Sequence, residues 1–338
     1  MTIYARLTSA AAVRSVLVPL LVTSIAMPQL YQPLLDRTWI SLRQISAYNW
    51  STFETMWTVF CYAVIEPSMT MVFIRNPHWR FVTMHQPSAS GRDKPRGMRR
   101  PSRRLGEIAI YLLPLLAMDL TMIKKFADVP LAEILSSGNH EYQVYLGGNG
   151  TLSANQPPKT FLIPTLHNFT RSSPLQLLRA LPTEAPSSRR LAFELIASFI
   201  IYDTVFFLFH LALHIVKPLQ CWHAPHHSHD AQINPQVTNQ LSIAERLGLV
   251  MLANFSLNII GAHVLTRTLF VPLFVWLLIE IHSGLDLPWA YDKILPRGWG
   301  GGARKHMKHH NTGNGGLEPF FCWIDRLYDR TTVVKNAE

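Results

Sequence analysis

Nine of the fifteen histidines fall into short motifs that can place imidazoles on one face of a helix. His210 and His214 form an HxxxH pair, and His282 stands alone at the end of an apolar stretch. Two HxxHH clusters contain His223, His226, His227 and His306, His309, His310. Helical residues three and four apart share a face, with Cβ atoms about 5–6 Å apart. The nine histidines are therefore predicted to be metal ligands.

The number of imidazoles favours two metal ions over one. A structural zinc ion takes about four ligands, and a catalytic one keeps about three protein ligands plus water. Nine histidines exceed the needs of a single ion. Imidazole binds iron as well as zinc, copper and nickel, so the residues alone leave the metal open. A di-zinc membrane hydrolase and a metal transporter stay as alternatives, since zinc has no redox chemistry.

The composition indicates a membrane protein. Of the 338 residues, 48% are hydrophobic and only 15% are charged, whereas a soluble domain carries about a quarter charged residues. The net charge of +10 comes from residues in loops between apolar stretches, which is typical of membrane orientation and argues against nucleic acid. The three cysteines, Cys61, Cys221 and Cys322, are far apart and odd in number, so they are predicted to be packing residues.

The apolar stretches predict an all-α, multi-pass membrane helical bundle with a cytosolic helical cap that carries a histidine-rich di-metal site. A membrane helix needs about 20 apolar residues. The candidate spans are 16–35, 53–74, 108–123, 191–216, 247–265 and 269–281. The last is short and could form a re-entrant hairpin with the span before it. The first lacks a convincing cleavage site, so it is predicted to be an anchor.

Charge and glycosylation motifs give the orientation. Between residues 75 and 104 lie eight arginines and Lys94 against one acid, Asp93, so this loop is predicted to face the cytosol. Counting crossings then places every histidine motif on the cytosolic side. The sequons at Asn49, Asn149 and Asn168 fall on the lumenal side, which predicts a glycoprotein. The predicted regions are an N-terminal transmembrane region, 1–123, with a basic loop, 75–106, a lumenal loop, 124–190, and a catalytic domain, 191–338.

One acid accompanies the histidines within the span 191–216. Asp203, His210 and His214 lie at i, i+7 and i+11, a single helical stripe near its cytosolic end. Ionisable groups inside the membrane are costly, so this stripe is predicted to face protein. Asp203 either accepts a hydrogen bond from the second ring nitrogen of a metal-bound imidazole, or is a buried acid that pairs with a structural histidine or with the backbone. His229 and His263 are predicted to be solvated or packed.

Three segments resemble the fatty acid hydroxylase and sterol desaturase superfamily. Residues 203–227, DTVFFLFHLALHIVKPLQCWHAPHH, have its acid and threonine before HxxxH and its step to HxxHH. Residues 282–289, HSGLDLPW, are similar to an element of the methylsterol oxidase and cholesterol side-chain hydroxylase branch. Residues 306–327 are similar to the closing HxxHH and its aromatic, Asp-Arg stretch. The likeness covers about residues 191–330. This chain departs from the family pattern at two places. It has Val205-Phe206 where many relatives have Trp-His, and it has Ser242-Ile243-Ala244-Glu245 where many have His-Pro before a downstream acid.

The resemblance implies a di-iron monooxygenase of the endoplasmic reticulum membrane whose site faces the cytosol. It would use dioxygen and NAD(P)H-derived electrons, delivered by cytochrome b5 or a reductase, to oxidise a C–H bond of a sterol-like or other lipophilic substrate. The two iron ions would be held by His210, His214, His223, His226, His227, His282, His306, His309 and His310. The catalytic set would be Asp203, His210, His214, His226, His227, His309 and His310. A desaturase with the same site and a non-catalytic sterol-binding relative are the alternatives, and the oligomeric state stays open.

Overall fold

The computed structural model describes residues 10–81, 98, 101–140, 162–227, 233–313 and 315–335. These residues form a helical bundle with one small antiparallel sheet, in which β1 (Met122–Ile123) pairs with β2 (Thr165–Leu166). The α-helices are α2 (Ala10–Ala26), α3 (Gln32–Gln44), α4 (Phe53–Arg75), α5 (Pro101–Thr121), α6 (Leu131–Ser137), α7 (Ser188–Ile215), α8 (Lys217–His227), α9 (Ile243–Ile259), α10 (Val264–Ile281), α11 (Tyr291–Ile294), α12 (Gly302–Thr312) and α13 (Trp323–Lys335). The 3₁₀ helices are η1 (Pro28–Leu30), η2 (Ser46–Asn49), η3 (Pro77–Trp79) and η4 (Pro235–Asn239).

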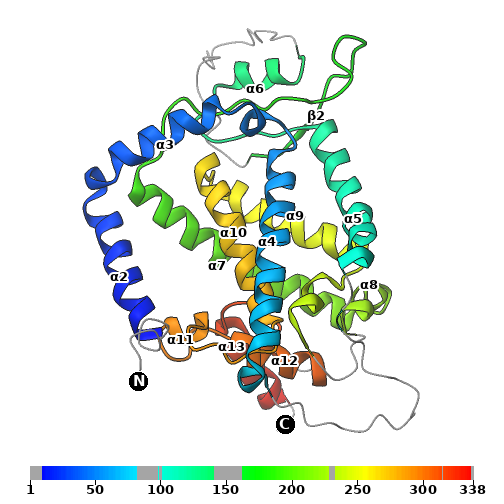
Figure 1. The fold of residues 1–338 in the computed structure, drawn as a ribbon. Coiled ribbons are helices and arrows are strands. Elements are labelled where there is room, and N and C mark those ends of the chain that lie inside the picture. Colours follow the sequence, from blue (N-terminus) through cyan, green and yellow to red (C-terminus); the bar gives the residue numbers. More distant parts are fainter. Residues whose placement is uncertain are drawn as a thin grey trace.

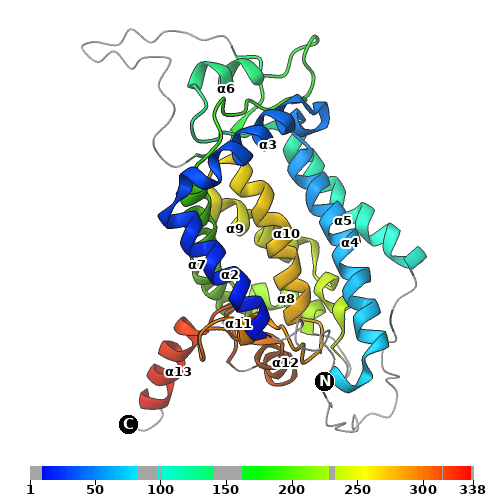
Figure 2. The same ribbon diagram turned by 60° about the vertical axis from the view of Figure 1, so that its left-hand side comes forward.

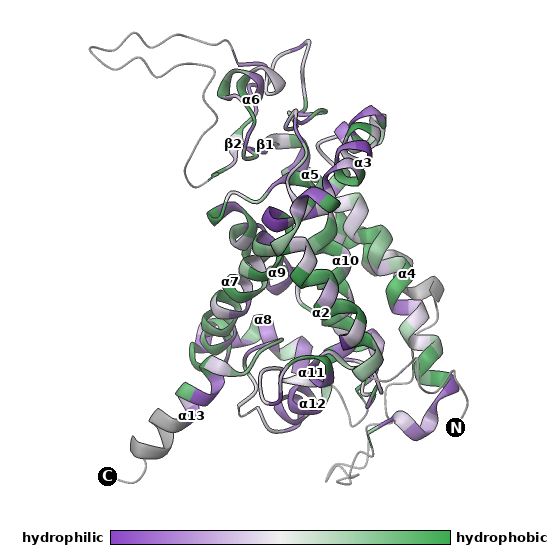
Figure 3. Ribbon diagram, turned by 90° about the vertical axis from the view of Figure 1, so that its left-hand side faces the viewer, coloured by the Kyte–Doolittle hydropathy of each residue, from purple (hydrophilic) through white to green (hydrophobic). Residues whose placement is uncertain are grey.

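Three of the described helices are long and apolar enough to cross a membrane, namely α4, α7 and α10. Two shorter apolar helices accompany them, α2 and the segment Ile108–Thr121 of α5. Apolar residues cover the long helices, whereas α12 and the start of α13 are mainly polar (Figure 3). This confirms the predicted helical class and supports membrane association.

Helix α10 is the centre of the bundle. It packs along α4 and α7 and also touches α12, while α9 packs on α7. A buried cluster of Tyr202, Phe206, Ile281, Tyr291 and Phe320 joins α7 and α10 to the C-terminal segment. Because this cluster lies next to the last turn of α10, it holds the histidine-bearing segments against the apolar helices.

The two ends of the bundle differ in character. Helices α8, α11, α12 and α13 gather at one end, together with the last turn of α4 (Figures 1 and 2). Helices α3 and α6 and the small sheet lie at the other. All nine predicted ligands are therefore at one end. The sequons at Asn49 and Asn168 lie at the opposite end, whereas Asn149 and most of the basic loop fall outside the described residues.

The predicted span 16–35 is wrong as a single helix. Helix α2 ends at Ala26, and the chain turns through η1 into α3. Pro28 explains the break, because proline has no N–H to donate and disfavours helical geometry in the residue before it. Met27 accordingly leaves the helix, with φ −131° and ψ 58°. Helix α3 then buries Trp39 and runs across the end of the bundle (Figure 1).

The two apolar segments predicted at 247–265 and 269–281 form the successive helices α9 and α10, but the turn between them lies earlier than the sequence indicated. Helix α9 ends at Ile259 and α10 begins at Val264. Gly261 adopts φ +61°, a backbone conformation that favours glycine. His263 accepts a hydrogen bond from the Leu265 N–H at 3.0 Å and is 1% exposed. It caps α10, so it is the packed residue that was predicted.

Candidate metal centre

The last turns of α7 carry the first two histidines of the site. His210 and His214 are four residues apart, so their rings leave the helix on one face. Helix α7 ends at Ile215. Val216 has an extended conformation, and α8 begins at the next residue. This sharp change of direction brings His223, His226 and His227 of α8 back toward α7.

His282 owes its position to a tight turn after α10. The residue caps that helix. Ser283 donates its hydroxyl to the Glu280 carbonyl and accepts from the Leu285 N–H. Gly284 has φ +67°, and an added Cβ would lie 2.3 Å from the Ile233 oxygen. Only glycine fits this turn, which gives a physical reason for the His-Ser-Gly order.

Helix α12 supplies the remaining three histidines. His306 and His309 are buried, and His310 is partly buried. Gly313 ends the helix in the left-handed conformation, with φ +67°. The inner side of α12 thus faces α7, α8 and the end of α10, while Arg304 and Lys308 on the same helix are exposed.

The nine histidines divide into two groups, each with ligand nitrogens within 4.8 Å of one another. One group contains His210, His214, His223, His227 and His309, and the other contains His226, His282, His306 and His310. In both HxxHH motifs the first and last histidines stay together and the middle one crosses to the other group. The two groups therefore interlock through α8 and α12, and every histidine predicted to be a ligand belongs to one of them.

The Nε2 atoms of the five-histidine group point toward one another. His210 Nε2 lies 2.9 Å from that of His223 and 3.1 Å from that of His309. His214 Nε2 lies 3.2 Å from that of His309. Metal–imidazole bonds of about 2.0–2.1 Å put two ligand nitrogens about 2.9 Å apart at a right angle and about 3.4 Å apart in a tetrahedron. These separations fit one metal ion.

The four-histidine group has the same spacing. His306 Nε2 lies 2.9 Å from that of His282 and 3.1 Å from that of His310. His226 Nε2 lies 3.3 Å from that of His282. A second ion of the same size would therefore fit this group, so the geometry is that of a pair of sites.

The other ring nitrogen shows which tautomer is present. Nδ1 of His210 donates to the Leu317 carbonyl at 2.9 Å, that of His309 to Gly315 at 2.8 Å, and that of His282 to Leu278 at 2.7 Å. A carbonyl can only accept, so the proton is on Nδ1. In a neutral ring, Nε2 then directs a lone pair into the group. Several lone pairs at this spacing repel one another unless a cation lies between them.

Burial reinforces the same conclusion. It lowers the pKa of His223 to about 2 and that of His309 to about 3, so both rings are neutral at physiological pH. Only neutral imidazole can bind a metal. Nε2 of His227 is buried and has no hydrogen-bond partner among the described residues. Each of the two groups could thus hold a metal ion.

Asp203 forms hydrogen bonds with the backbone of the C-terminal segment. Its carboxylate accepts from the N–H groups of Phe320 at 2.8 Å and Phe321 at 3.2 Å, and the residue is 1% exposed. No hydrogen bond to a described histidine is found. Of the two roles considered for Asp203, the structure supports pairing with the backbone. It fixes the segment whose carbonyls at Gly315 and Leu317 receive the imidazole protons.

Replacing Asp203 with alanine should destabilise the protein by about 3 kcal/mol, because two buried N–H groups lose their acceptor. The measurement is the denaturation midpoint of the purified protein in detergent. Asp286→Ala is the matched control, since Asp286 is half exposed and exposed ion pairs contribute about 0–1 kcal/mol. Equal midpoints for the Asp203 variant and the wild type would contradict this role.

Sequence reasoning missed Glu245. Ser242 and Glu245 have the spacing of a capping box, and Ser242 does accept from the Glu245 N–H. The Glu245 carboxyl group, however, forms a hydrogen bond with Nδ1 of His223 at 2.7 Å. The residue is 3% exposed, and its helix-capping position in the sequence hid its role at the site. Phe206 packs on His210, with the ring centroids 5.1 Å apart.

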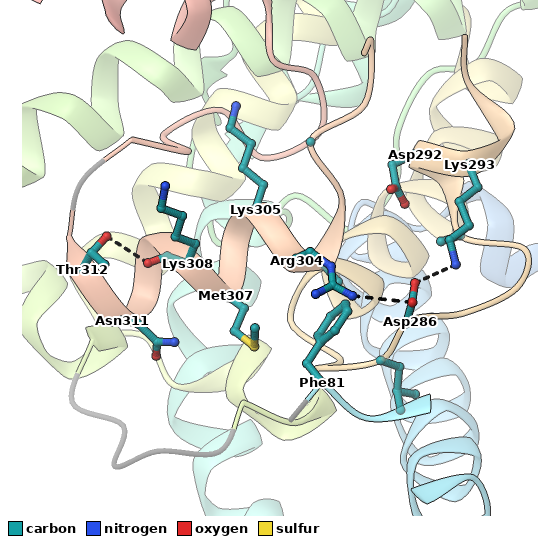
Figure 4. Close-up of a pocket in the computed structure, with 14 residues that line it drawn as sticks. Phe81, Asp286, Asp292, Lys293, Arg304, Lys305, Met307, Lys308, Asn311 and Thr312 are labelled. Carbon is teal, nitrogen blue, oxygen red and sulfur yellow. Dashed lines mark hydrogen bonds and ion pairs between the residues drawn. The ribbon is translucent and has the colours of Figure 1, made fainter. Parts of the chain in front are cut away.

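A cleft of about 720 Å³ lies on the outer side of α12 (Figure 4). Its lining includes Arg304, Lys305 and Lys308 but no histidine. Asp286 pairs with Lys293 at 2.6 Å and with Arg304 at 3.6 Å. The cleft is therefore a charged surface feature, and α12 separates it from the imidazoles. His229 lies outside the described residues.

Comparison with known proteins agrees with the resemblance. Residues 195–330 match the family model for fatty acid hydroxylase. The chain is 32% identical over 169 residues to cholesterol 25-hydroxylase of Rattus norvegicus, covering 49% of this chain and 55% of that protein. It is 31% identical to the enzyme of the same name from Homo sapiens, covering 49% and 60%. A provisionally named methylsterol monooxygenase of Dictyostelium discoideum is 32% identical, covering 42% and 52%. The chain spans little more than half the length of these relatives, and no solved structure matches it.

Proposed function

We propose, on the premise that residues 195–330 form a fatty acid hydroxylase family domain, that the protein is a membrane-bound di-iron oxygenase acting on a lipophilic substrate. It hydroxylates or oxidises a C–H bond of a sterol-like lipid, with dioxygen and electrons from NAD(P)H through cytochrome b5 or a reductase. The observation that carries this proposal is the interlocked pair of imidazole groups. The sterol-like substrate follows from the names of the relatives.

In this proposal some residues bind the metal ions and others hold the binding residues in position. The nine histidines would hold two iron ions, which supply the redox chemistry for oxygen activation when bound. The carbonyls of Leu317, Gly315 and Leu278 hold three imidazoles by their Nδ1 protons, and Glu245 holds His223. Partners of this kind fix the orientation of a ligand and raise its basicity. Phe206 covers His210 and limits the access of water.

The proposed setting is the endoplasmic reticulum, with the histidine end facing the cytosol. Three apolar helices support the membrane part of this proposal. The orientation rests on the excess of basic residues in the sequence between positions 75 and 104. The described end of α4, where this stretch begins, lies at the same end of the bundle as the histidine-bearing helices. A cytosolic site would be open to soluble electron donors.

Turnover under labelled dioxygen tests the proposal. The full chain is purified with its metals quantified, and is then supplied with NAD(P)H, a reductase system and cholesterol or a methylsterol. We expect two iron ions per chain and one labelled oxygen atom in the alcohol product, with no turnover when dioxygen or reductant is omitted. Mass spectrometry of the product measures the label.

The alternatives give different outcomes in the same experiment. A desaturase would yield a product that has lost two hydrogens and carries no label. A di-zinc hydrolase would contain zinc and work without dioxygen, taking its oxygen from water. A non-catalytic sterol-binding relative would bind the sterol but return it unchanged. Any of these results would overturn the proposed hydroxylation.

A further inference from the structure

An apolar chamber of about 340 Å³ lies between α4, α5, α9 and α10. One wall is a single face of α10, formed by Arg267, Phe270, Val271 and Phe274 at three- and four-residue spacing. Arg267 precedes His282 by fifteen residues, which is about 22 Å along a helix. The polar end of the chamber is therefore far from the imidazoles, and no histidine lines it.

The end of the chamber next to the small sheet is charged. Glu54 accepts from Arg267 at 2.8 Å, from Arg179 at 3.3 Å and from Lys124 at 3.4 Å. Lys124 also pairs with Asp119 at 2.7 Å. These groups are mostly buried, and three cations meet two carboxylates. The network therefore keeps one excess positive charge at the polar end of an otherwise apolar space.

Lys125 adds a second positive charge at this end of the chamber. It lines the chamber and is partly buried. Among the residues that the structure describes, its ammonium makes no hydrogen bond and no ion pair. Burial lowers the pKa of Lys125 because the ammonium has lost water without gaining an acceptor. A partly buried ammonium that has no acceptor favours an anion beside it.

We propose that this chamber is a lipid-binding site separate from the metal centre, and that it takes one single-chain lipid with a carboxylate head. The head would pair with Lys125, and the chain would lie along Val271 and Phe274. The volume is near the lower limit of ligand pockets, about 300–1,000 Å³, which favours one acyl chain over the two of a phospholipid. The inference does not rest on the proposed oxygenase activity.

Binding of cis-parinaric acid, a fluorescent fatty acid, to the full chain in a neutral detergent tests this proposal. Its methyl ester is the uncharged match. We expect the acid to bind about tenfold more tightly than the ester, because a charged hydrogen bond to Lys125 is lost in the ester. Lys125→Gln should remove this preference. Val271→Phe should weaken both ligands about tenfold by filling the chamber.

Two control variants separate the site from general effects. Arg171→Gln removes an exposed positive charge at the same end, and Leu273→Phe adds an aromatic ring on α10 at a side chain that is 48% exposed. Both should bind the acid and the ester like the wild type. The metal content of every variant should stay unchanged, so a failure here is distinct from a failure of the oxygenase proposal.

Several outcomes would overturn the lipid site. The acid and ester could bind equally to the wild type, or Lys125→Gln could keep the preference for the acid. Val271→Phe in a folded protein could bind both ligands as the wild type does. Displacement of the probe by a two-chain phosphatidic acid at lower concentration than by oleic acid would show that the occupant is a phospholipid. If Val271→Phe does not fold, Lys125→Gln alone still tests the contact with the head group.

Discussion

Alanine at His309 is expected to abolish product formation while the protein stays inserted in the membrane. His309 is fully buried, and its Nε2 lies close to those of His210 and His214. Losing a residue that only orients a ligand costs about 10–100-fold, so losing a ligand should cost more than about 100-fold. Product per mole of membrane-inserted protein, measured by mass spectrometry, checks this expectation.

The companion variant His226→Ala distinguishes two ions from one. His226 belongs to the four-histidine group and His309 to the five-histidine group. Each variant should lose all product but only about one of the two ions, as measured by metal analysis. His78→Ala is the control, because His78 is exposed and belongs to neither group. Unchanged turnover in either ligand variant would contradict the proposed metal centre.

Glu245→Gln is expected to lower metal affinity or activity by about 10–100-fold. Glu245 lies 2.7 Å from Nδ1 of His223. When His223 binds a metal through Nε2, Nδ1 carries the proton, and an amide oxygen is a weaker acceptor for that proton than a carboxylate. Glu245→Ala should lose more, because it leaves the proton without an acceptor in a buried place. Metal affinity, measured by competition with a chelator, separates this positioning role from a general loss of stability.

The control for this pair is Glu133→Gln. Glu133 is exposed on α6, at the end of the molecule remote from the histidines. The same change of charge there should leave metal affinity as it is in the wild type. If Glu245→Gln retained full affinity as well, the His223–Glu245 contact would have no part in holding the metal.

The sequence by itself determined the helical class and the identity of the histidine motifs. Repeats at three and four residues are local, because the helical period alone puts His210 and His214 on one face. The apolar stretches predicted helices at 53–74 and 191–216, and the structure has them at 53–75 and 188–215. The counting of crossings also predicted that motifs nearly a hundred residues apart meet at one end, and the structure gathers them there.

Hydropathy and helical periodicity predicted the structure less well where a single residue breaks a helix or binds a distant part of the chain. Pro28 divides the predicted first span, although hydropathy continues through it. The sequence predicted that Asp203 faces protein, because it shares a helical face with His210 and His214. Its hydrogen-bond partners, however, are backbone N–H groups 117 and 118 residues away. Every residue except proline has a backbone N–H, so the sequence does not show which one a distant carboxyl group will bind. The sequence therefore could not distinguish pairing with the backbone from support of a metal-bound imidazole.

Only the tertiary structure decided which imidazoles share a site. Adjacent residues in a helix point about 100° apart, so His226 and His227 cannot both face one ion in the same way. Which group each joins depends on how α8 and α12 pack against α7 and α10. The packing sends His226 to His282 and His227 to His214. The spacing of histidines along the chain specifies which face of a helix they share. Which histidines of other helices they meet is specified by the packing between helices.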